Sequence, residues 1–301
     1  MTNSILITGA SGLIGERLTE LLLQKGCRVS HLGRSIRKGK VPSFLWDIEA
    51  GTIDKEAFNG IDTVIHLAGA GIADKRWSRA RKQEILDSRL GSTDLLCKAL
   101  KEGVTSVRTV IAASAIGYYG FGDSSAWFNE ESSPGSDFLS SVVVKWEHET
   151  DRLQVRGIRL VKIRIGIVLS ERGGALKEIA RPVRWGFGAC LGTGQQMVSW
   201  IHLDDLCEMF AMSIQNNAMM GAFNASAPNP VTNKELTESI ARVLGKRILL
   251  PNVPSFAMHL LIGEMADLVL YGSKVSCEKI QHAGYKFVYP ELAPALKDLF
   301  G

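Results

Sequence analysis

Residues 4–15, near the amino terminus, read SILITGASGLIG. The apolar, β-branched run Ser4–Thr8 predicts a buried strand, and apolar residues at helical spacing after it predict a helix. Gly9 permits a tight turn, Gly12 lets backbone N–H groups approach a pyrophosphate, and Gly15 lets the helix pack on the strand. We therefore expect a dinucleotide-binding turn, with its phosphates held by Gly9, Ser11, Gly12, Leu13, Ile14 and Gly15.

The end of the second predicted strand, Arg28–Leu32, indicates which nicotinamide dinucleotide fits. A carboxylate there accepts the ribose 2′-OH of NAD, whereas a cation accommodates the 2′-phosphate of NADP. After Gly33 no Asp or Glu occurs until Asp47. Arg34 can offer phosphate a charge-assisted fork and Ser35 a hydroxyl. The pattern predicts NADP(H). The alternative, less favoured, is that Arg34 is an exposed loop arginine in the basic cluster Arg34, Arg37, Lys38 and Lys40.

Alternating strand and helix patterns continue to about residue 165 and predict an α/β fold with a Rossmann-type, doubly wound parallel sheet. Further strands are predicted at Thr63–Leu67, Thr109–Ala113, Leu160–Ile165 and Ile248–Leu250. Helices are predicted over about 79–102, 140–155, 175–184, 232–244 and 290–299. The glycine-rich pattern after residue 165 predicts a smaller C-terminal α/β substrate domain. The dinucleotide-binding domain is expected at 1–165 plus about 191–225, and the substrate domain at about 166–190 plus 226–301.

The carboxyl ends of two predicted strands extend the expected cofactor site. Asp47 and the segment Leu67-Ala68-Gly69 lie where such a sheet opens its crevice, so both are expected to line the adenosine half. His66 precedes that segment. We interpret it as a buried strand histidine with a local hydrogen bond rather than as a catalytic base.

The composition limits the classes of protein to which this chain can belong. With 46% apolar and 22% charged residues the 301-residue chain has ordinary globular usage. Its net charge is +4 with acids and bases interspersed, which disfavours a nucleic-acid binder. No segment approaches the length of a membrane span. The five cysteines are far apart and form no CxxC, so we expect reduced thiols, no metal site and a cytoplasmic location.

Later motifs carry a family resemblance. Residues 111–114 read IAAS and are followed by Tyr-Tyr-Gly at 118–120, Arg164 ends a strand, and residues 200–206 read WIHLDDL. With the glycine motif, these segments resemble the extended (atypical) short-chain dehydrogenase/reductases, which include NAD-dependent epimerases and dehydratases. Three runs are similar to its "epimerase family protein" subgroup, which is associated with NADP(H): ADKRW (73–77), GYYG (117–120) and KWE (145–147).

The resemblance implies a proton relay that this sequence alters. The family uses a Ser or Thr, a Tyr and a Lys four residues after the Tyr, often with an Asn. No tyrosine here is followed by such a lysine. Ser114 fits the serine position, Lys145 is the one lysine on the expected helix, and Ser141 stands one turn before it. The Asn position is expected to hold Ser88. Lys145 and Ser88 are then cofactor contacts as well.

Other side chains are candidates by position. Tyr118 or Tyr119 could supply a phenol from the serine loop, or could pack as ordinary aromatic residues at the sheet edge. The resemblance places Arg184 in the glycine-rich excursion where the family often contacts a nucleotide diphosphate. The expected substrate contacts are Trp77, Arg76, Arg184 and Gln195, with Trp77 more typical of packing than of stacking on a ligand.

Two functions follow from this sequence. The first is an NADP(H)-dependent oxidoreductase or epimerase-like enzyme for a small polar, nucleotide-sugar-like substrate, with Ser114, Lys145, Tyr118 and Tyr119 as catalytic candidates. The second is a non-catalytic NADP(H)-binding sensor or scaffold that has lost the YxxxK relay. The sequence leaves the substrate, the reaction direction and the oligomeric state open, a homodimer included.

Overall fold

The computed structural model describes residues 3–103, 105–121 and 126–301. An eight-stranded sheet forms its centre, in the order β12 (Gly221–Ala225), β8 (Arg159–Ile165), β6 (Thr109–Ala115), β5 (Thr63–His66), β1 (Ser4–Thr8), β2 (Arg28–Gly33), β3 (Ser43–Asp47) and β4 (Thr52–Ile53). All neighbours pair in parallel except β4, which is antiparallel to β3. The predicted Rossmann-type parallel sheet is confirmed.

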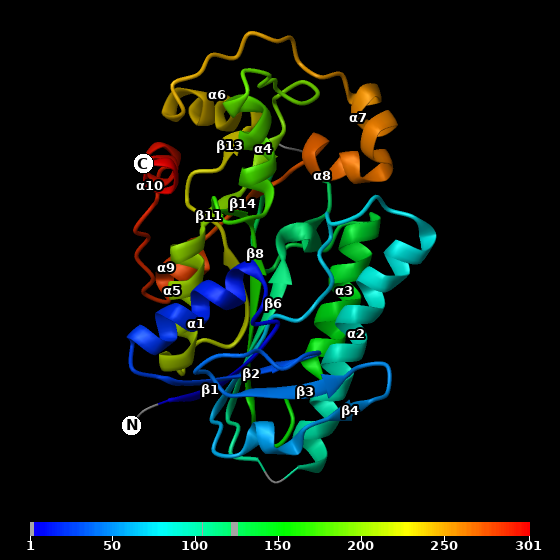
Figure 1. Ribbon diagram of the computed structural model, residues 1–301, viewed down its shortest axis with the longest axis vertical. Coiled ribbons are helices and arrows are strands. Elements are labelled where there is room, and N and C mark those ends of the chain that lie inside the picture. The colour runs from blue at the N-terminus through cyan, green and yellow to red at the C-terminus, as the bar shows by residue number, and fades with distance from the viewer. Residues whose placement is uncertain (1–2, 104, 122–125) are drawn as a thin grey trace.

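Helices cover both faces of this sheet (Figure 1). Successive side chains of a strand point to opposite faces. Ile5 and Ile7 of β1 therefore pack with α1 (Leu13–Gln24) and α5 (Leu203–Gln215), while Leu6 packs in the core on the α2 (Arg79–Glu102) side. The helix α3 (Phe138–Asp151) lies against α2. Because α2 and α3 begin at the carboxyl edge of the sheet, their first turns face the expected cofactor crevice.

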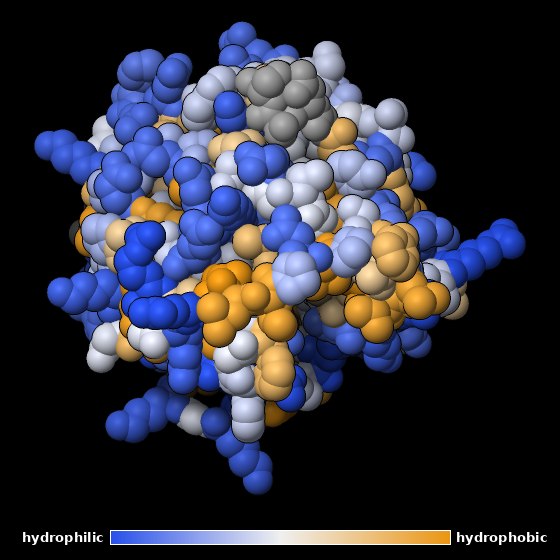
Figure 2. Space-filling view, turned by 90° about the horizontal axis from the view of Figure 1, so that it is seen from above, coloured by the Kyte–Doolittle hydropathy of each residue, from blue (hydrophilic) through white to orange (hydrophobic). Residues whose placement is uncertain are grey.

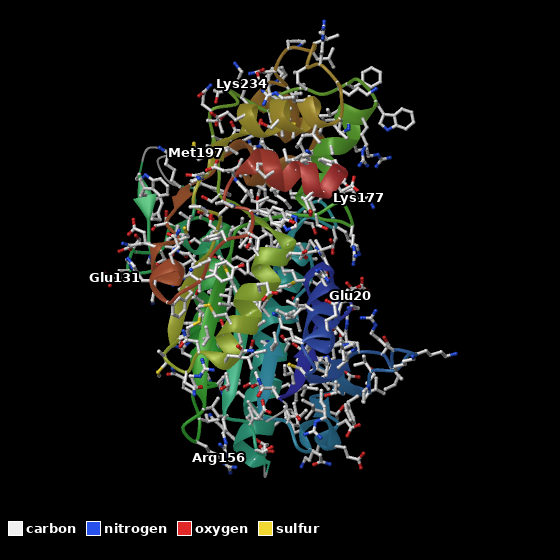
Figure 3. The ribbon with its side chains drawn as sticks, turned by 90° about the vertical axis from the view of Figure 1, so that its left-hand side faces the viewer. Glu20, Glu131, Arg156, Lys177, Met197 and Lys234 are labelled. Atoms are coloured by element: carbon white, nitrogen blue, oxygen red, sulfur yellow. The ribbon has the colours of Figure 1, made fainter. Side chains whose placement is uncertain are left out.

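A third apolar core lies above the carboxyl ends of the strands. Helices α4 (Ala175–Arg184), α6 (Asn233–Val243) and α10 (Leu292–Phe300) surround it, with Trp200 fully buried at its centre. Figure 3 shows Lys177 of α4 and Lys234 of α6 above Glu20 of α1. The predicted helix after Thr232 is present, capped reciprocally by Thr232 and Glu235. The domain boundaries stay a prediction.

The chain between α6 and α10 differs most from expectation. The strand predicted at Ile248–Leu250 is wrong, because these residues pair with no strand within the described chain and Leu249 and Leu250 are exposed. Helix α7 (Ser255–Ile262) follows, apolar yet with none of its residues buried. Figure 2 views the upper face, where orange apolar groups gather. Phe256, Leu260 and Leu261 contribute exposed apolar side chains.

Short elements complete the chain. They are β7 (Trp127–Phe128), β9 (Ile167–Leu169), β10 (Met197–Val198), β11 (Trp200–His202), β13 (Val231–Thr232), β14 (Lys274–Val275), η1 (Lys55–Phe58), η2 (Ile116–Tyr119), η3 (Gly263–Ala266), α8 (Asp267–Leu270) and α9 (Glu278–His282). Among the described helices, none is both long and apolar enough to cross a bilayer.

Candidate functional site

The turn between β1 and α1 is tightly packed at two of its three glycines. Gly9 has a φ of +68°, and a Cβ there would lie 2.8 Å from the backbone of Leu67. A Cβ on Gly15 would lie 2.6 Å from the Cα of Ala10. Both positions therefore require glycine. They bring the turn, the helix and the β5 loop into direct contact.

Gly12 differs from these two glycines because its missing side chain faces open space. A Cβ there would meet only the Gly9 carbonyl oxygen, at 3.4 Å. Gly12 also caps α1 without any side-chain hydrogen bond. The first N–H groups of a helix have no partner within it, so those of Leu13 and Ile14 are available to an anion. These residues fit the pyrophosphate of a dinucleotide.

The cationic side chains of the loop after β2 lie in different surroundings. Arg34 and Ser35 are exposed where β2 ends. Arg37 instead crosses to the glycine turn, where Nη1 donates to the Ala10 carbonyl at 2.7 Å and Nη2 to Glu16 at 3.0 Å. Sequence reasoning selected Arg34 from the basic cluster and missed Arg37, because spacing alone does not show which arginine turns back over the turn.

The β5 end is tied to the glycine turn through β1. The buried His66 bonds Thr8 Oγ1 at 2.8 Å through Nδ1 and Thr93 Oγ1 at 3.1 Å through Nε2. Burial lowers the pKa of His66 to about 4, so the ring is neutral near pH 7. The expected structural histidine is confirmed. Thr8 Oγ1 also accepts the N–H groups of Leu67 and Ala68, which fixes this loop beside the phosphate position.

Two other predicted cofactor contacts lie at strand or helix positions with local roles. Asp47 is exposed at the end of β3, and its carboxylate accepts the N–H groups of Glu49 and Ala50 in the turn that follows. Ser88 of α2 accepts the N–H of Ala70 at 3.0 Å. Ser88 therefore positions the loop after β5.

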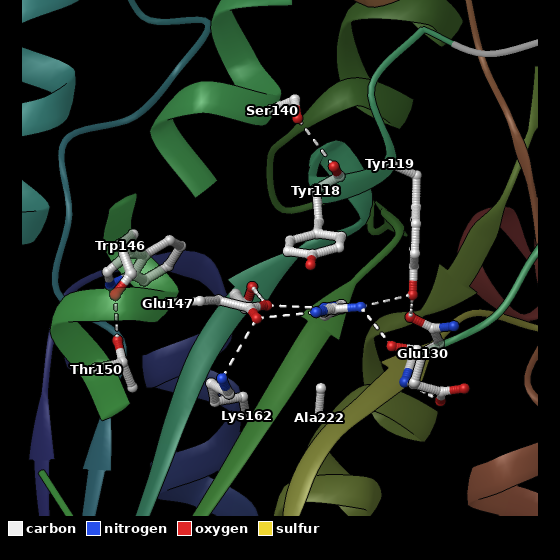
Figure 4. Close-up of polar contacts among 12 residues, drawn as sticks. Tyr118, Tyr119, Glu130, Ser140, Trp146, Glu147, Thr150, Lys162 and Ala222 are labelled. Atoms are coloured by element: carbon white, nitrogen blue, oxygen red, sulfur yellow. Dashed lines mark hydrogen bonds and ion pairs between the residues drawn. The ribbon is translucent and has the colours of Figure 1, made fainter. Parts of the chain in front are cut away.

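A buried ion pair lies beside β6, the strand that carries Ser114 (Figure 4). Glu147 of α3 accepts the Ser114 hydroxyl at 2.6 Å and Arg164 Nε at 2.8 Å on one oxygen, and Arg164 Nη2 at 2.9 Å on the other. The Arg164 and Glu147 side chains are only 5% and 7% exposed. Burial raises the pKa of Glu147, but Arg164, Ser114 and Lys162 outweigh it, so the pKa falls below its usual value. Glu147 is therefore ionised.

The same network occupies one of the two candidate phenols. Tyr119 donates to Asn224 Oδ1 at 2.7 Å and accepts from Arg164 Nη1 at 3.0 Å. Burial raises the pKa of Tyr119 to about 12. The ring of Tyr118 lies 3.6 Å from Arg164 Cζ and is half-buried. Tyr119 is thus held as a structural hydroxyl.

A pocket of about 410 Å³ opens between the first turns of α2 and α3. Its lining residues are Trp77, Ser78, Arg79, Lys82, Gln83, Leu86, Phe138, Ser141, Val142, Lys145 and Glu264. The Trp77 and Phe138 rings are 5.1 Å apart. Lys82 pairs with Glu264 of η3 across the pocket. Aromatic walls with three cations and one carboxylate suit a planar, anionic ligand.

The pocket contains Lys145 and Ser141 but not Ser114. Lys145 and Glu147 are two residues apart, which separates them by about 200° around the helix. Lys145 therefore faces the pocket while Glu147 faces the sheet and holds Ser114. Ser114 and Lys145, which were predicted to share one reacting centre, therefore do not both line this pocket.

The predicted substrate contacts are scattered. Trp77 lines the pocket, although its indole N–H is taken by the Ile72 carbonyl at 2.9 Å. Arg76 is exposed beside Gly263 of η3. Arg184 lies away from the pocket, paired with Glu171 and stacked 5.3 Å from the Phe300 ring. Gln195 is exposed on the loop before β10.

Several pocket and network residues escaped sequence reasoning. Lys82 and Glu264 come from segments 182 residues apart, and no local pattern relates them. Glu147 lies in the KWE run, two residues after Lys145, so its buried position on α3 could have been found from helical periodicity. Its partner Arg164 was noted in the sequence only as the residue at the end of a strand.

Comparisons with known proteins identify relatives along the whole chain. Residues 5–225 match the NAD dependent epimerase/dehydratase family, and residues 253–299 match a domain of unknown function, DUF1731. The epimerase family protein YfhF of Bacillus subtilis is 34% identical over 298 residues, 98% of this chain and 97% of that protein.

Two solved structures share both fold and sequence. Human epimerase family protein SDR39U1 (isoform 2), crystallised with NADPH, superposes with a TM-score of 0.89 at 32% identity, covering 98% of each chain. A nucleoside-diphosphate sugar epimerase from Corynebacterium glutamicum gives 0.82 at 30% identity, covering 100% of this chain and 59% of that one. The resemblance seen in the sequence is confirmed, and the chain belongs to the NAD dependent epimerase/dehydratase family.

Proposed function

We propose that this protein binds NADP(H) at the β1–α1 turn and acts as an oxidoreductase or epimerase-like enzyme on a small polar substrate. The observation that carries the proposal is the open α1 N-terminus behind Gly12, which a pyrophosphate would fill. A relative of 32% identity was crystallised with NADPH, which supports this choice of cofactor.

The basic loop after β2 supports NADP(H) over NAD(H). Arg34 and Ser35 would meet the 2′-phosphate, because no carboxylate ends β2 to receive a ribose hydroxyl. Arg37 adds a cation beside the same turn, partly offset by Glu16. Asp47 and the loop at 67–69 would border the adenosine half.

The pocket residues suggest how a substrate would be held. The nicotinamide, when bound, supplies hydride transfer. Lys145 would hold the ribose hydroxyls at the pocket, with Ser141 in place of the family's tyrosine. Lys82 and Arg79 would attract an anionic, nucleotide-sugar-like substrate, a class supported by the sugar epimerase among the relatives. Trp77 would pack against it.

Proton exchange would then come from outside α3. The Ser114 hydroxyl already donates to the ionised Glu147, so it can only accept a further hydrogen bond. It would orient a hydroxyl rather than polarise a carbonyl. Tyr118 is our candidate proton donor, because Tyr119 is committed to Asn224.

Calorimetry with NADPH and NADH tests the cofactor. We expect tighter binding of NADPH, an Arg34→Ala variant that loses affinity for NADPH only, and a folded Gly12→Val variant that binds neither. Equal affinity for the two dinucleotides would refute the choice of NADP(H), and normal binding by Gly12→Val would refute the site.

A panel of sugar nucleotides and small carbonyl compounds, followed by absorbance, tests the reaction. Turnover should fall in Lys145→Met, Tyr118→Phe and Ser114→Ala. Brisk turnover in all three would refute the assignment of the reacting groups.

A second candidate, a non-catalytic NADP(H)-dependent sensor or scaffold, is favoured by one observation: Ser141 stands where the relay needs a phenol. Intact NADPH binding without turnover of any compound in the panel would favour this sensor.

A further inference from the structure

Arg89 of α2 is a buried cation that has no part in the function proposed above. The residue is 7% exposed. Its Nη1 donates to the carbonyls of Ala70 at 3.1 Å and Ile85 at 2.8 Å, and its Cζ lies 5.0 Å from the Trp146 ring. The guanidinium is therefore held in one orientation, between the loop after β5 and α3.

Among the described residues, no carboxylate neutralises this charge. Within the described residues, Arg89 forms no ion pair, and its side-chain hydrogen bonds come from Nη1 alone, to two backbone carbonyls. Burial, and then the neighbouring cation Arg81, lower the pKa of Arg89 to about 10, so it is still charged near pH 7. A buried charge without a partner is costly. Its retention points to a ligand that supplies the negative charge.

Residue 69 lies over this guanidinium and is a glycine, so the opening above it is the space of the missing side chain. Gly69 is exposed, and a Cβ there would lie 3.3 Å from Arg89 Cζ and 3.6 Å from Nε. Its φ lies outside the left-handed region, so the backbone does not require glycine. Any side chain would cover the guanidinium. Glycine places no side-chain atom over it.

The opening lies beside the phosphate position. Gly69 continues the Leu67–Ala68 segment, whose backbone lies 2.8 Å from a Cβ placed on Gly9. The next residue, Ala70, is tied to α2 on both sides, through Ser88 and through Arg89 itself. Arg89 therefore faces the carboxyl edge of the sheet at the strand next to the glycine turn.

We propose that Arg89 is an anion-binding residue, which contacts a phosphate group of a ligand through the gap left by Gly69. The inference rests on the proposed function, because it assumes a phosphate-bearing ligand at this edge. The phosphate belongs either to the dinucleotide or to a nucleotide-diphosphate substrate, and the two sources share the same recognition chemistry: a guanidinium fork to phosphate oxygens.

Calorimetry on the full chain, with NADPH and with UDP-glucose as probes, separates the sources. Arg89→Met removes the cation. Gly69→Ala keeps it but covers it, so this variant guards against a folding defect in the first. Gly173→Ala is the matched control, because its Cβ would find no atom nearer than 4.0 Å. Arg89→Lys, which keeps a charge without the fork, should lose less affinity than Arg89→Met.

We expect Arg89→Met and Gly69→Ala each to weaken one probe by about tenfold or more, as for loss of a charge-assisted contact, while Gly173→Ala changes neither. A loss for NADPH assigns the phosphate to the dinucleotide, and a loss for UDP-glucose alone assigns it to the substrate. Unchanged affinity for both probes in the two variants overturns the inference. Failure of the unaltered chain to bind NADPH instead overturns the proposed function.

Discussion

Removing either partner of the buried Glu147–Arg164 pair should destabilise the fold far more than removing an exposed pair. Two charge-assisted bonds of 2.8 and 2.9 Å join side chains that are 7% and 5% exposed. Loss of one partner from such a pair costs about 3–5 kcal/mol, because a buried charge remains. Glu147→Leu should cost the most, since it leaves Arg164 without a carboxylate. Arg164→Met should cost less, because Lys162 stays 3.4 Å from Glu147.

The double variant distinguishes a buried charge from lost packing. Glu147→Leu with Arg164→Met leaves neither charge, so its cost should fall below the sum of the single costs by about 2 kcal/mol. Urea unfolding followed by circular dichroism at pH 7 gives each free energy of unfolding. Arg152→Met is the control, because Arg152 is 42% exposed in its pairs and its loss should cost far less than either single variant. Single costs no larger than this control, or a strictly additive double variant, would refute the reasoning.

Three further outcomes are expected. The free energy of unfolding should fall as the pH drops from about 6.5 toward 4, because His66 stays neutral in the fold, with a pKa of about 4, while His66 of the unfolded chain takes up a proton. Urea unfolding of His66→Asn should show a shallower dependence of this free energy on pH. The same pH dependence in His66→Asn and in the unaltered chain would contradict this prediction. Thr232→Ala should lose about 1 kcal/mol by the same assay, since it breaks the capping box, whereas Thr232→Ser should be nearly neutral. Gly15→Val should lower the melting temperature measured by calorimetry, because its Cβ would lie 2.6 Å from the Ala10 Cα, and an unaltered melting temperature would show that the turn can shift.

Periodicity located β1, β2, β5, β6 and β8 of the central sheet but not its strands β3, β4 and β12. Strands buried on both faces read as continuous apolar runs, so β1, β2 and β6 were located within two residues of their bounds. The apolar run at 248–250 has the same appearance and forms no strand, because no neighbouring strand pairs with it. Pairing partners are set by tertiary contact, which a local pattern cannot report.

The candidate site, too, was predictable from the sequence only in part. The glycine turn was predictable, because three glycines at this spacing between a strand and a helix recur in dinucleotide-binding proteins. The hydrogen-bond partner of Ser114 could not be predicted, because Glu147 is 33 residues away and contacts Ser114 only when α3 packs on β6. Arg89 stood beside Ser88 in the sequence without any sign that its charge would be buried and, among the described residues, without an acidic partner.

The third core has a consequence for biosynthesis. Its buried residues come from α4 and β11, from α6, and from Leu292, Ala295 and Leu296 of α10. The sheet, by contrast, is complete once β12 has been made at residue 225. While α10 is still inside the ribosome, the nascent chain exposes the apolar faces of α4 and α6 above a finished sheet. A chaperone acting on this protein during translation would therefore meet that half-built core.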